Sequence, residues 1–401
     1  MSYPDYPPPR HVAGAAAPPV AYDADVVILA LDRAPETIEA IASARAQRGV
    51  SRHVWVADQG SRPENLAALA AAVADATDAT LVQLERNWGV AGGRNRATAP
   101  GHGRVVFALD NDAEFATPDT LAQAVAALDA APDIAAIACR ILVHADGGED
   151  ASSWGYPPAL LPRVADSFDT VTFVGAGHAI LRVDFARAGG YDDALFFCWE
   201  EFDFALRAIN LGQRIRYRGD IAVRHKVSGE QRVQWSGTRW FHFVRNRLYV
   251  AMKYGAPPAS LLPRFLGYQV KGLRNGVLPQ GLRAGREALR LARAFRPPAG
   301  QEALYRLTPQ ALDYIARNDT AHRGGWLRRA RAEMLAALPS GVRPVVAKPV
   351  SADAPPATAA GGSPGHPPGS GAPGGAGPAP AATPTPGRRA APAPVHAAPF
   401  R

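Results

Sequence analysis

Four short β-rich runs, separated by helical stretches, constrain the fold of this chain most strongly. Pro35 suits the first position of one helix, and residues 117–119 supply a cap, a proline and an acidic first turn for another. Strand–helix–strand alternation with short connections predicts βαβ units, and therefore an α/β fold with a mostly parallel sheet flanked by helices. The runs are DVVILAL (25–31), HVWVAD (53–58), TLVQLE (80–85) and RVVFAL (104–109).

Polar residues follow each of these runs. In open α/β sheets, ligands bind beyond the carboxyl ends of the strands, so these positions are the candidate site. They are Asp32-Arg33, Asp58-Gln59-Gly60-Ser61, residues 87–95 (NWGVAGGRN) and Asp110-Asn111-Asp112.

The pair Asp110 and Asp112 is the most informative of these motifs. Two carboxylates at i and i+2 after a strand can turn toward one hard cation, and Mg²⁺ or Mn²⁺ prefers such oxygen ligands. A plain turn before the cap at Thr117 is the alternative. The apolar strand before the pair and the other polar strand ends favour a metal site.

Residues 87–95 contain glycines at positions 89, 92 and 93. The spacing is not G-x-G-x-x-G, which argues against a dinucleotide-dependent dehydrogenase. Glycines at these positions would let backbone N–H groups approach a phosphate, and Arg94 would add positive charge. An ordinary loop rich in left-handed residues is the alternative.

Acidic residues at 200, 201 and 203 open a helix that extends to about Gly212. They complement the helix dipole, or one of them is a general base that the aromatic residues at 196, 197 and 199 partly desolvate. His225 ends another apolar run, where the local sequence favours a surface histidine over a metal ligand.

The composition argues against a membrane-spanning protein, a secreted protein and a small disulfide-rich domain. The 401 residues contain two cysteines, and no apolar run approaches the roughly 18 residues that span a bilayer. The first residues, rich in proline, do not resemble a secretory signal. Gly, Ala, Pro, Ser and Thr supply 43 of the 50 residues from 351 to 400, which predicts disorder.

The sequence divides into four parts. We expect a disordered arm (1–22), a catalytic domain (23–234), a basic helical region (235–340) and a disordered tail (341–401).

The basic charge is concentrated in residues 235–300. The whole chain has 44 Lys+Arg and 36 Asp+Glu, but this segment alone has twelve basic residues and one acid, Glu287. Helices with basic residues on one face and aromatic residues on the other bind anionic membrane surfaces. The alternative is a helical subdomain whose aromatic residues pack inward. Nucleic acid is not expected, because no binding motif accompanies the charge. The apolar residues of the segment are Trp235, Trp240, Phe241, Phe243, Leu248, Tyr249, Phe265, Leu266, Tyr268 and Val270.

Taken in order, these motifs resemble the inverting family 2 glycosyltransferases of GT-A fold, especially the rhamnosyltransferase-like branch of bacterial surface polysaccharide synthesis. The resemblance covers about residues 25–255. The matching pieces are Val26–Arg33, D-Q-G-S at 58–61, N-W-G-V-A-G-G-R-N at 87–95, L-D-N-D at 109–112, G-A-G-H-A-I-L-R at 175–182, G-G-Y-D at 189–192, F-F-C-W-E-E-F-D-F-A-L-R at 196–207, V-R-H-K-V-S-G at 223–229 and Arg245-Asn246-Arg247.

The resemblance implies transfer of a sugar from a nucleoside-diphosphate sugar to a hydroxyl of a glycan or lipid-linked acceptor, with Mg²⁺ or Mn²⁺. It implies a cytoplasmic enzyme, peripheral on the inner face of the plasma membrane. Glu201 takes the place of the usual aspartate as the base. The implied catalytic residues are Glu200, Glu201 and Asp203. The donor-binding residues are Arg33, Asp58, Asn87, Gly89, Gly93, Arg94, Asn95, Asp110, Gly175 and Ala176. Asp192 and Trp199 position sugar or acceptor, and Asp110, Asp112 and His225 bind the metal.

Two other functions compete with this one. A sugar nucleotidyltransferase has a related fold, but it needs a long loop rich in Gly and Lys or Arg after the first strand, and here that loop is short. A nucleotide- or carbohydrate-binding protein without catalysis is supported only by the unusual Glu200-Glu201 pair. Fold alone does not decide between these functions.

Overall fold

The computed structural model describes residues 6–16, 18, 21–226 and 237–325. The predicted tail (341–401) and the predicted boundary at residues 234–235 lie outside these ranges. The strands are β1 (Arg10–Gly14), β2 (Ala24–Ala30), β3 (Arg52–Asp58), β4 (Ala79–Gln83), β5 (Val105–Leu109), β6 (Ala113–Phe115), β7 (Ile134–Val143), β8 (Ser167–Thr170), β9 (Gly177–Leu181) and β10 (Arg214–His225). The α-helices are α1 (Ala34–Arg45), α2 (Pro63–Val73), α3 (Gly89–Thr98), α4 (Thr120–Asp129), α5 (Arg182–Arg187), α6 (Glu200–Asn210), α7 (Gly237–Lys253), α8 (Leu262–Arg274), α9 (Leu278–Ala294) and α10 (Pro309–Asn318).

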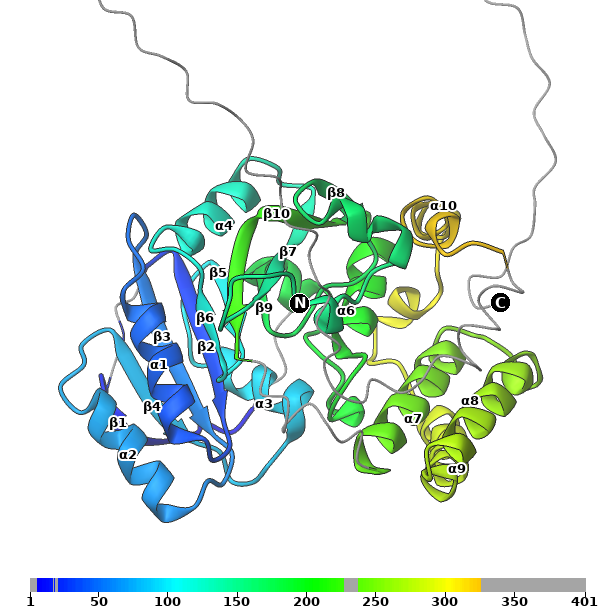
Figure 1. Cartoon of the computed structure of the whole chain (residues 1–401), viewed down its shortest axis with the longest axis horizontal. Coiled ribbons are helices and arrows are strands. Elements are labelled where there is room, and N and C mark those ends of the chain that lie inside the picture. The colour runs from blue at the N-terminus through cyan, green and yellow to red at the C-terminus, as the bar shows by residue number, and fades with distance from the viewer. Residues whose placement is uncertain (1–5, 17, 19–20, 227–236, 326–401) are drawn as a thin grey trace, which may run out of the picture. The chain divides into compact units, whose positions relative to one another are not determined.

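The described strands form one mixed sheet in the order β1-β4-β3-β2-β5-β9-β7-β10-β6, with β8 also paired to β10 (Figure 1). Strands β4, β3, β2 and β5 pair in parallel, and so do β7 and β10. Strand β9 runs antiparallel between β5 and β7, so all six parallel strands point the same way. The sheet is therefore mostly parallel, as the alternation of runs predicts.

Helices cover both faces of the sheet, because its central strands are apolar on both sides. Ile41 of α1, Leu69 of α2 and Leu121 of α4 share one core with Val26 and Ile28 of β2. Helices α3 and α6 belong to cores on the other side of the sheet. This arrangement leaves the carboxyl ends of the parallel strands at one common edge.

The prediction of a disordered arm over residues 1–22 is wrong for residues 10–14. Strand β1 pairs antiparallel with β4, and Arg10 lies opposite Gln83 and Gly14 opposite Thr80. The hydroxyl of Thr80 also donates to the carbonyl of Ala15 at 2.7 Å. Without β1, the backbone of β4 would have one unpaired side, so this pairing satisfies its hydrogen-bonding groups.

The basic region contains α7, α8 and α9, which lie side by side in Figure 1. Trp240, Tyr249 and Tyr268 are buried in the core that these helices share with the catalytic domain. These aromatic residues therefore do not form the exposed apolar face that the sequence predicted. None of the described helices is long and apolar enough to cross a membrane.

Candidate active site

The predicted metal ligands lie together at the carboxyl edge of the sheet. Asp110 and Asp112 follow β5, and β10 ends at His225. The antiparallel pairing of β10 with β6 sets His225 opposite Ala113, directly beside Asp112. One ligand atom from each of Asp110, Asp112 and His225 lies within 4.8 Å of the other two. Two carboxylates and one imidazole are a donor set that suits Mn²⁺ or Mg²⁺.

Charged neighbours stabilise the ionised form of Asp112. Its Oδ1 lies 3.3 Å from His225 Nε2, and Nη1 of Arg33 donates to its Oδ2 at 2.9 Å. Burial alone would raise the pKa of Asp112, but His225 and Arg33 outweigh burial and lower this pKa to about 2. Asp112 is therefore a carboxylate at neutral pH, as a cation ligand must be.

His225 is surrounded by negative charge. Burial would lower the pKa of this imidazole, but hydrogen bonds to Asp112 and Asp150 raise it to about 9. The same field that stabilises a proton on His225 would stabilise a divalent cation at that place.

Asp150 is a site residue that sequence reasoning missed. Its Oδ2 lies 3.3 Å from Nδ1 of His225, on the side of the ring away from Asp112. The backbone N–H groups and hydroxyls of Ser152 and Ser153 hold the Asp150 carboxylate in place. A carboxylate on the second nitrogen of a metal-binding histidine fixes the orientation and tautomer of its ring. Nothing local in the sequence marks Asp150, because His225 lies 75 residues away.

Arg94 connects the carboxylates at the strand ends with those of α6. The side chain is buried, with 3% of the residue exposed. Its Nη2 donates to Asp110 Oδ1 at 2.8 Å and to the carbonyl of Gly175 at 2.7 Å. Its Nη1 lies 3.4 Å from Glu201 Oε1 and 3.9 Å from Glu200 Oε1. The Arg94 guanidinium thus contacts Asp110 through Nη2 and Glu201, the predicted base, through Nη1.

Glu200 and Glu201, in the first turn of α6, differ in their surroundings. Glu200 is buried, whereas 14% of the Glu201 side chain is exposed. Burial and the neighbouring Glu201 raise the pKa of Glu200 well above its usual range. Burial also raises the pKa of Glu201, but Arg94 and a hydrogen bond from Glu200 oppose that rise. Glu200 therefore retains the proton of the pair, and Glu201 is the accessible carboxylate.

Two of the predicted catalytic and positioning acids are paired with cationic side chains of the protein. Asp203 is fully buried and accepts hydrogen bonds from Arg207 and Lys253. Asp192 accepts from Lys253 at 2.7 Å and from the hydroxyl of Tyr249 at 3.0 Å. Because its side chain is 0% exposed and paired with two cations, Asp203 cannot reach a substrate, so its predicted role in catalysis is wrong. The predicted role of Asp192 in positioning sugar or acceptor stays a prediction. Both belong to an ion-pair network beneath α6.

The predicted phosphate cradle over residues 87–95 is also wrong, because its amides already have partners. The N–H groups of Val90 and Ala91 both point to the carbonyl of Phe196. The side-chain oxygen of Asn87 accepts from the N–H of Gly89, which has a φ of 70°. A Cβ at Gly93 would lie 2.7 Å from Gln59 Oε1, so this glycine permits close packing.

Four more predicted site residues have structural partners. The buried amide of Asn95 donates to the carbonyl of Tyr191 and to Asp193, and so secures the segment before α6. Asp58 accepts from the N–H groups of Gly60 and Ser61, which forms the turn after β3. Trp199 donates from its indole to the carbonyl of Phe243. The carbonyl of Ala176 accepts from the N–H of Asp110.

Gly175 is a predicted site residue that the structure does place against the acid pair. A Cβ at this position would lie 2.6 Å from Glu201 Oε1 and 3.2 Å from Arg94 Nη2. The absence of a side chain therefore allows the carboxylate and the guanidinium to meet.

The described residues thus form a mixed α/β protein whose mostly parallel sheet carries two aspartates and a histidine at its carboxyl edge. Residues 25–189 match the family model described as glycosyl transferase family 2. The resemblance in the sequence is confirmed over these residues.

The chain is similar to the succinoglycan biosynthesis protein ExoO of Rhizobium meliloti (strain 1021). The two are 35% identical over 125 residues, which is 31% of this chain and 35% of ExoO. The chain therefore matches about a third of the length of that relative.

Three solved structures of glycosyltransferases are similar at low identity. The mannosyltransferase PcManGT from Pyrobaculum calidifontis, in complex with GDP-Man and Mn²⁺, has a TM-score of 0.46 and 22% identity, over 80% of this chain and 86% of that one. GalNAc-T7 with UDP, GalNAc and Mn²⁺ has a TM-score of 0.41 and 17% identity, over 51% and 43%. TarS 1–349 from S. aureus, in complex with UDP, has a TM-score of 0.41 and 15% identity, over 68% and 89%.

Proposed function

We propose that this protein is an inverting, metal-dependent glycosyltransferase that uses a nucleoside-diphosphate sugar. The observation that carries the proposal is the position of Arg94 between two kinds of carboxylate. Asp110 on one side belongs to the metal-type cluster, and Glu201 on the other side is accessible and has a raised pKa. A transferase needs both a charged centre for the leaving diphosphate and a base for the acceptor.

Asp110, Asp112 and His225 would hold the divalent cation, and their donor atoms fit Mg²⁺ or Mn²⁺. When bound, the cation stabilises negative charge on the departing diphosphate. Arg33, which lies against Asp112 and 28% of whose side chain is exposed, is close enough to the cluster to add positive charge for the same diphosphate.

Glu201 removes the proton from the acceptor hydroxyl as that oxygen forms its bond to the anomeric carbon and the diphosphate leaves with the bonding electrons. The hydroxyl approaches on the face opposite the diphosphate, so the anomeric configuration inverts. Glu200 does not compete for the proton, because it already carries one. Arg94 fixes Glu201 and Asp110 relative to each other, and so sets the line between acceptor and leaving group.

The acceptor that we propose is a glycan or a lipid-linked sugar of cell-surface polysaccharide synthesis. The name of the curated relative, a succinoglycan biosynthesis protein, supports this class. The positive charge of residues 235–300 supports attachment to the anionic inner face of the plasma membrane, where a lipid-linked acceptor would be met. We assign no nucleic-acid partner.

A panel of sugar nucleotides tests this proposal, each offered with and without Mn²⁺ or Mg²⁺. We expect metal-dependent release of nucleoside diphosphate and a product of inverted anomeric configuration. Release of pyrophosphate from a nucleoside triphosphate and a sugar phosphate would instead show a nucleotidyltransferase. Tight donor binding without any turnover, with or without metal, would show a binding protein.

Asp112→Ala should abolish turnover and leave the fold intact, because the residue lies at the edge of the sheet and not in the apolar core. Loss of one ligand should cost several kcal/mol of transition-state stabilisation. The measurement is the transfer rate at saturating donor and metal, alongside circular dichroism. Asp166→Ala, at an exposed carboxylate away from the site, is the matched control. A near-normal rate for Asp112→Ala would contradict the metal assignment.

A further inference from the structure

An unpartnered apolar stripe runs along one side of α8. Leu262, Leu266, Val270 and Leu273 are separated by four, four and three residues, so they share one face of the helix. Their exposed fractions are 53%, 53%, 46% and 66%. Large aliphatic side chains this exposed along one helix face mark a surface that binds something apolar.

An apolar pocket of about 210 Å³ opens beside this stripe. Leu248 and Met252 of α7, Leu261 and Phe265 around the start of α8, and Leu289 of α9 line it. Leu262 both lines the pocket and begins the stripe, so the two are continuous. The pocket is open to solvent and lined by apolar side chains, so it suits a hydrocarbon segment better than a polar ligand.

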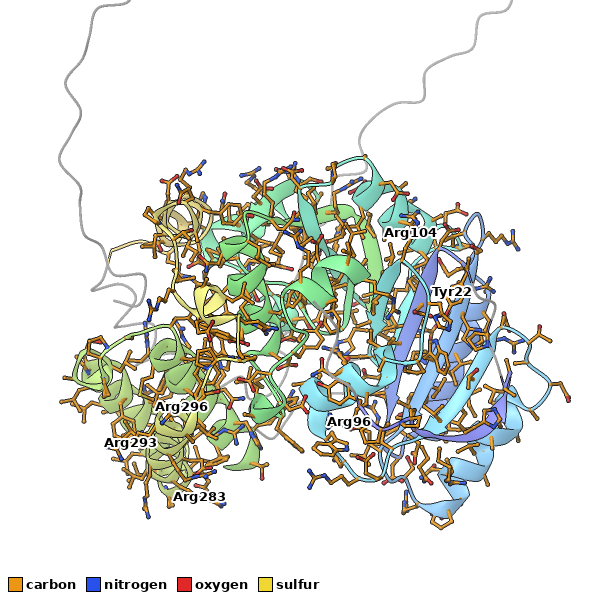
Figure 2. All side chains as sticks on the ribbon, turned by 180° about the vertical axis from the view of Figure 1, so that it is seen from behind. Tyr22, Arg96, Arg104, Arg283, Arg293 and Arg296 are labelled. Carbon is orange, nitrogen blue, oxygen red and sulfur yellow. The ribbon has the colours of Figure 1, made fainter. Side chains whose placement is uncertain are left out.

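The two helices that carry the stripe and the pocket, α8 and α9, are rich in basic residues. From residue 262 to residue 296, eight residues are Lys or Arg and one is acidic, which gives a net charge of +7. Arg274 is exposed near the end of the stripe, and Arg286, Arg290 and Arg293 are exposed on α9. Figure 2 shows Arg283, Arg293 and Arg296 among the side chains of this region. An apolar face with this charge matches one kind of partner, a hydrocarbon layer that carries anionic head groups.

We propose that the α8–α9 face docks on an anionic lipid bilayer, with Leu262, Leu266, Val270 and Leu273 inserted and an acyl chain entering the adjoining pocket. This deepens the proposed function, which places the enzyme at a membrane, by naming the surface that makes contact. Of the apolar residues expected to do this, Trp240, Tyr249 and Tyr268 are buried, whereas Leu266 and Val270 are exposed on α8. A second copy of the chain fits less well, because two such faces would bring like charges together. Nucleic acid would leave the aliphatic stripe against a polar partner.

Co-sedimentation of the full chain with lipid vesicles tests the docking. We expect binding to vesicles of phosphatidylcholine mixed with phosphatidylglycerol, weak binding to phosphatidylcholine alone, and weaker binding as salt is raised. No donor or acceptor is present, so the result does not depend on whether the chain is a transferase. Absence of binding to every vesicle would overturn the proposal.

Two pairs of variants locate the contact. Leu266→Gln with Leu273→Gln should lower the partition coefficient at least about tenfold, since two aliphatic side chains that would insert into the bilayer are lost. Val183→Gln, at a valine of α5 that is 61% exposed, is the control and should bind normally. Arg286→Gln with Arg293→Gln should lower vesicle binding by about fivefold per charge removed. Arg163→Gln with Arg317→Gln is the control for this pair and should bind as the unaltered chain does. Equal effects of the test and control variants would reject this face.

Hydrogen exchange and oligomeric state supply independent readouts. Bound vesicles should slow amide exchange in α8 and α9 and leave α10 unchanged. Transfer to a lipid-free acceptor should be the same for the Leu266→Gln, Leu273→Gln variant and the unaltered chain, because these residues lie outside the active site. A concentration-dependent dimer that this variant abolishes, without any lipid binding by the unaltered chain, would assign the face to a second copy instead.

Discussion

At the scale of single residues, the surroundings of two adjacent glutamates assign them different roles. Glu200 is buried, and its Oε2 has no hydrogen-bond partner in the part of the chain that the structure describes. An ionised carboxylate there would lose solvation, and Arg94, 3.9 Å from Oε1, would compensate only in part. Glu201 is partly exposed and lies against Arg94, so it ionises more readily than Glu200 does.

Glu201→Gln should reduce transfer by roughly 10²–10⁴-fold with little loss of donor affinity, because the amide keeps the shape but accepts no proton. Glu200→Gln should be milder, since glutamine replaces a carboxyl group that is already protonated. Transfer rates and donor binding are to be measured on both variants. A larger loss in Glu200→Gln would identify Glu200 as the base.

The same pair predicts a pH dependence. Burial raises the pKa of Glu201 above its usual range, and only the ionised form accepts a proton. The ratio kcat/KM should therefore fall as pH is lowered through a pKa above the normal glutamate value. A profile that follows an ordinary, fully exposed glutamate would argue against Glu201 as the base.

Asp150→Asn should weaken metal binding by about 10- to 100-fold, as is typical when the partner of a metal-binding histidine is changed. Asparagine keeps an oxygen for the serine N–H groups but no longer offers a carboxylate to His225. Calorimetric titration with Mn²⁺ measures the change without any turnover. Asp146→Asn alters an exposed turn nearby and is the control. Equal Mn²⁺ affinities of the two variants would remove Asp150 from the site.

At the scale of elements, α7 holds the segment that positions the acid pair. Phe196, Cys198 and Trp199 have φ values of 60°, 68° and 73°, a region that costs non-glycine residues ~1–3 kcal/mol each. The side-chain amide of Asn246 donates to the carbonyls of Leu195, Phe197 and Cys198 at 2.7–2.8 Å. Those hydrogen bonds offset the backbone strain of residues 196–199. Helix α6, which carries Glu200 and Glu201, begins directly after these residues.

Asn246→Ala should therefore lower kcat more than donor affinity, because it loosens the start of α6 without touching the metal cluster. It should also lower the free energy of unfolding by roughly 1–3 kcal/mol, since buried carbonyls lose their donor. Asn246→Asp should be at least as harmful, as a carboxylate would face three carbonyl oxygens. Unchanged kcat in both variants would show that α7 has no part in positioning the acids.

At the scale of the whole molecule, one buried lysine joins α7 to the catalytic domain. Lys253 donates to Asp192 at 2.7 Å and to Asp203 at 3.0 Å. Burial would raise the pKa of Asp192, but Lys253 lowers it to about 2. Because this folded-state pKa is lower than the ordinary value of 3.8, the stabilisation is complete above about pH 4 and is lost as pH falls toward 2.

Lys253→Met should cost about 3–5 kcal/mol of unfolding free energy at neutral pH, since Asp192 loses its cationic partner and the fully buried Asp203 keeps only Arg207. Thermal or urea denaturation as a function of pH measures this. The deficit should shrink under acid conditions, where protonation of Asp192 already removes the pair from the unaltered chain. A constant deficit at all pH values would mean that lost packing, and not charge, is responsible.

The sequence predicted those features that depend on local pattern. Strands β2, β3, β4 and β5 begin and end within two residues of the predicted runs, because alternation and strand-end polarity are local signals. The cluster of Asp110, Asp112 and His225 followed from the strand-end rule and the family resemblance.

Features that depend on packing between distant segments could not be predicted. Whether a polar side chain at a helix start faces a ligand or a neighbour is decided by those segments. Asp203, in the same turn as Glu201, is bonded to Lys253, 50 residues further along the chain. Asp150 gains its role only through His225.

The pairing of β1 with β4 also determines which shortened chains remain soluble. Among the described strands, β1 is the one that lies beyond β4 in the sheet, and its five residues cover the outer side of β4. A chain that starts after residue 16 would present the bare backbone of β4, including the apolar Leu81 and Val82, to any extended segment nearby. During expression at high concentration, such chains would add to one another strand by strand. Tags or fusions at the N-terminus should therefore be joined ahead of Arg10, with β1 left whole.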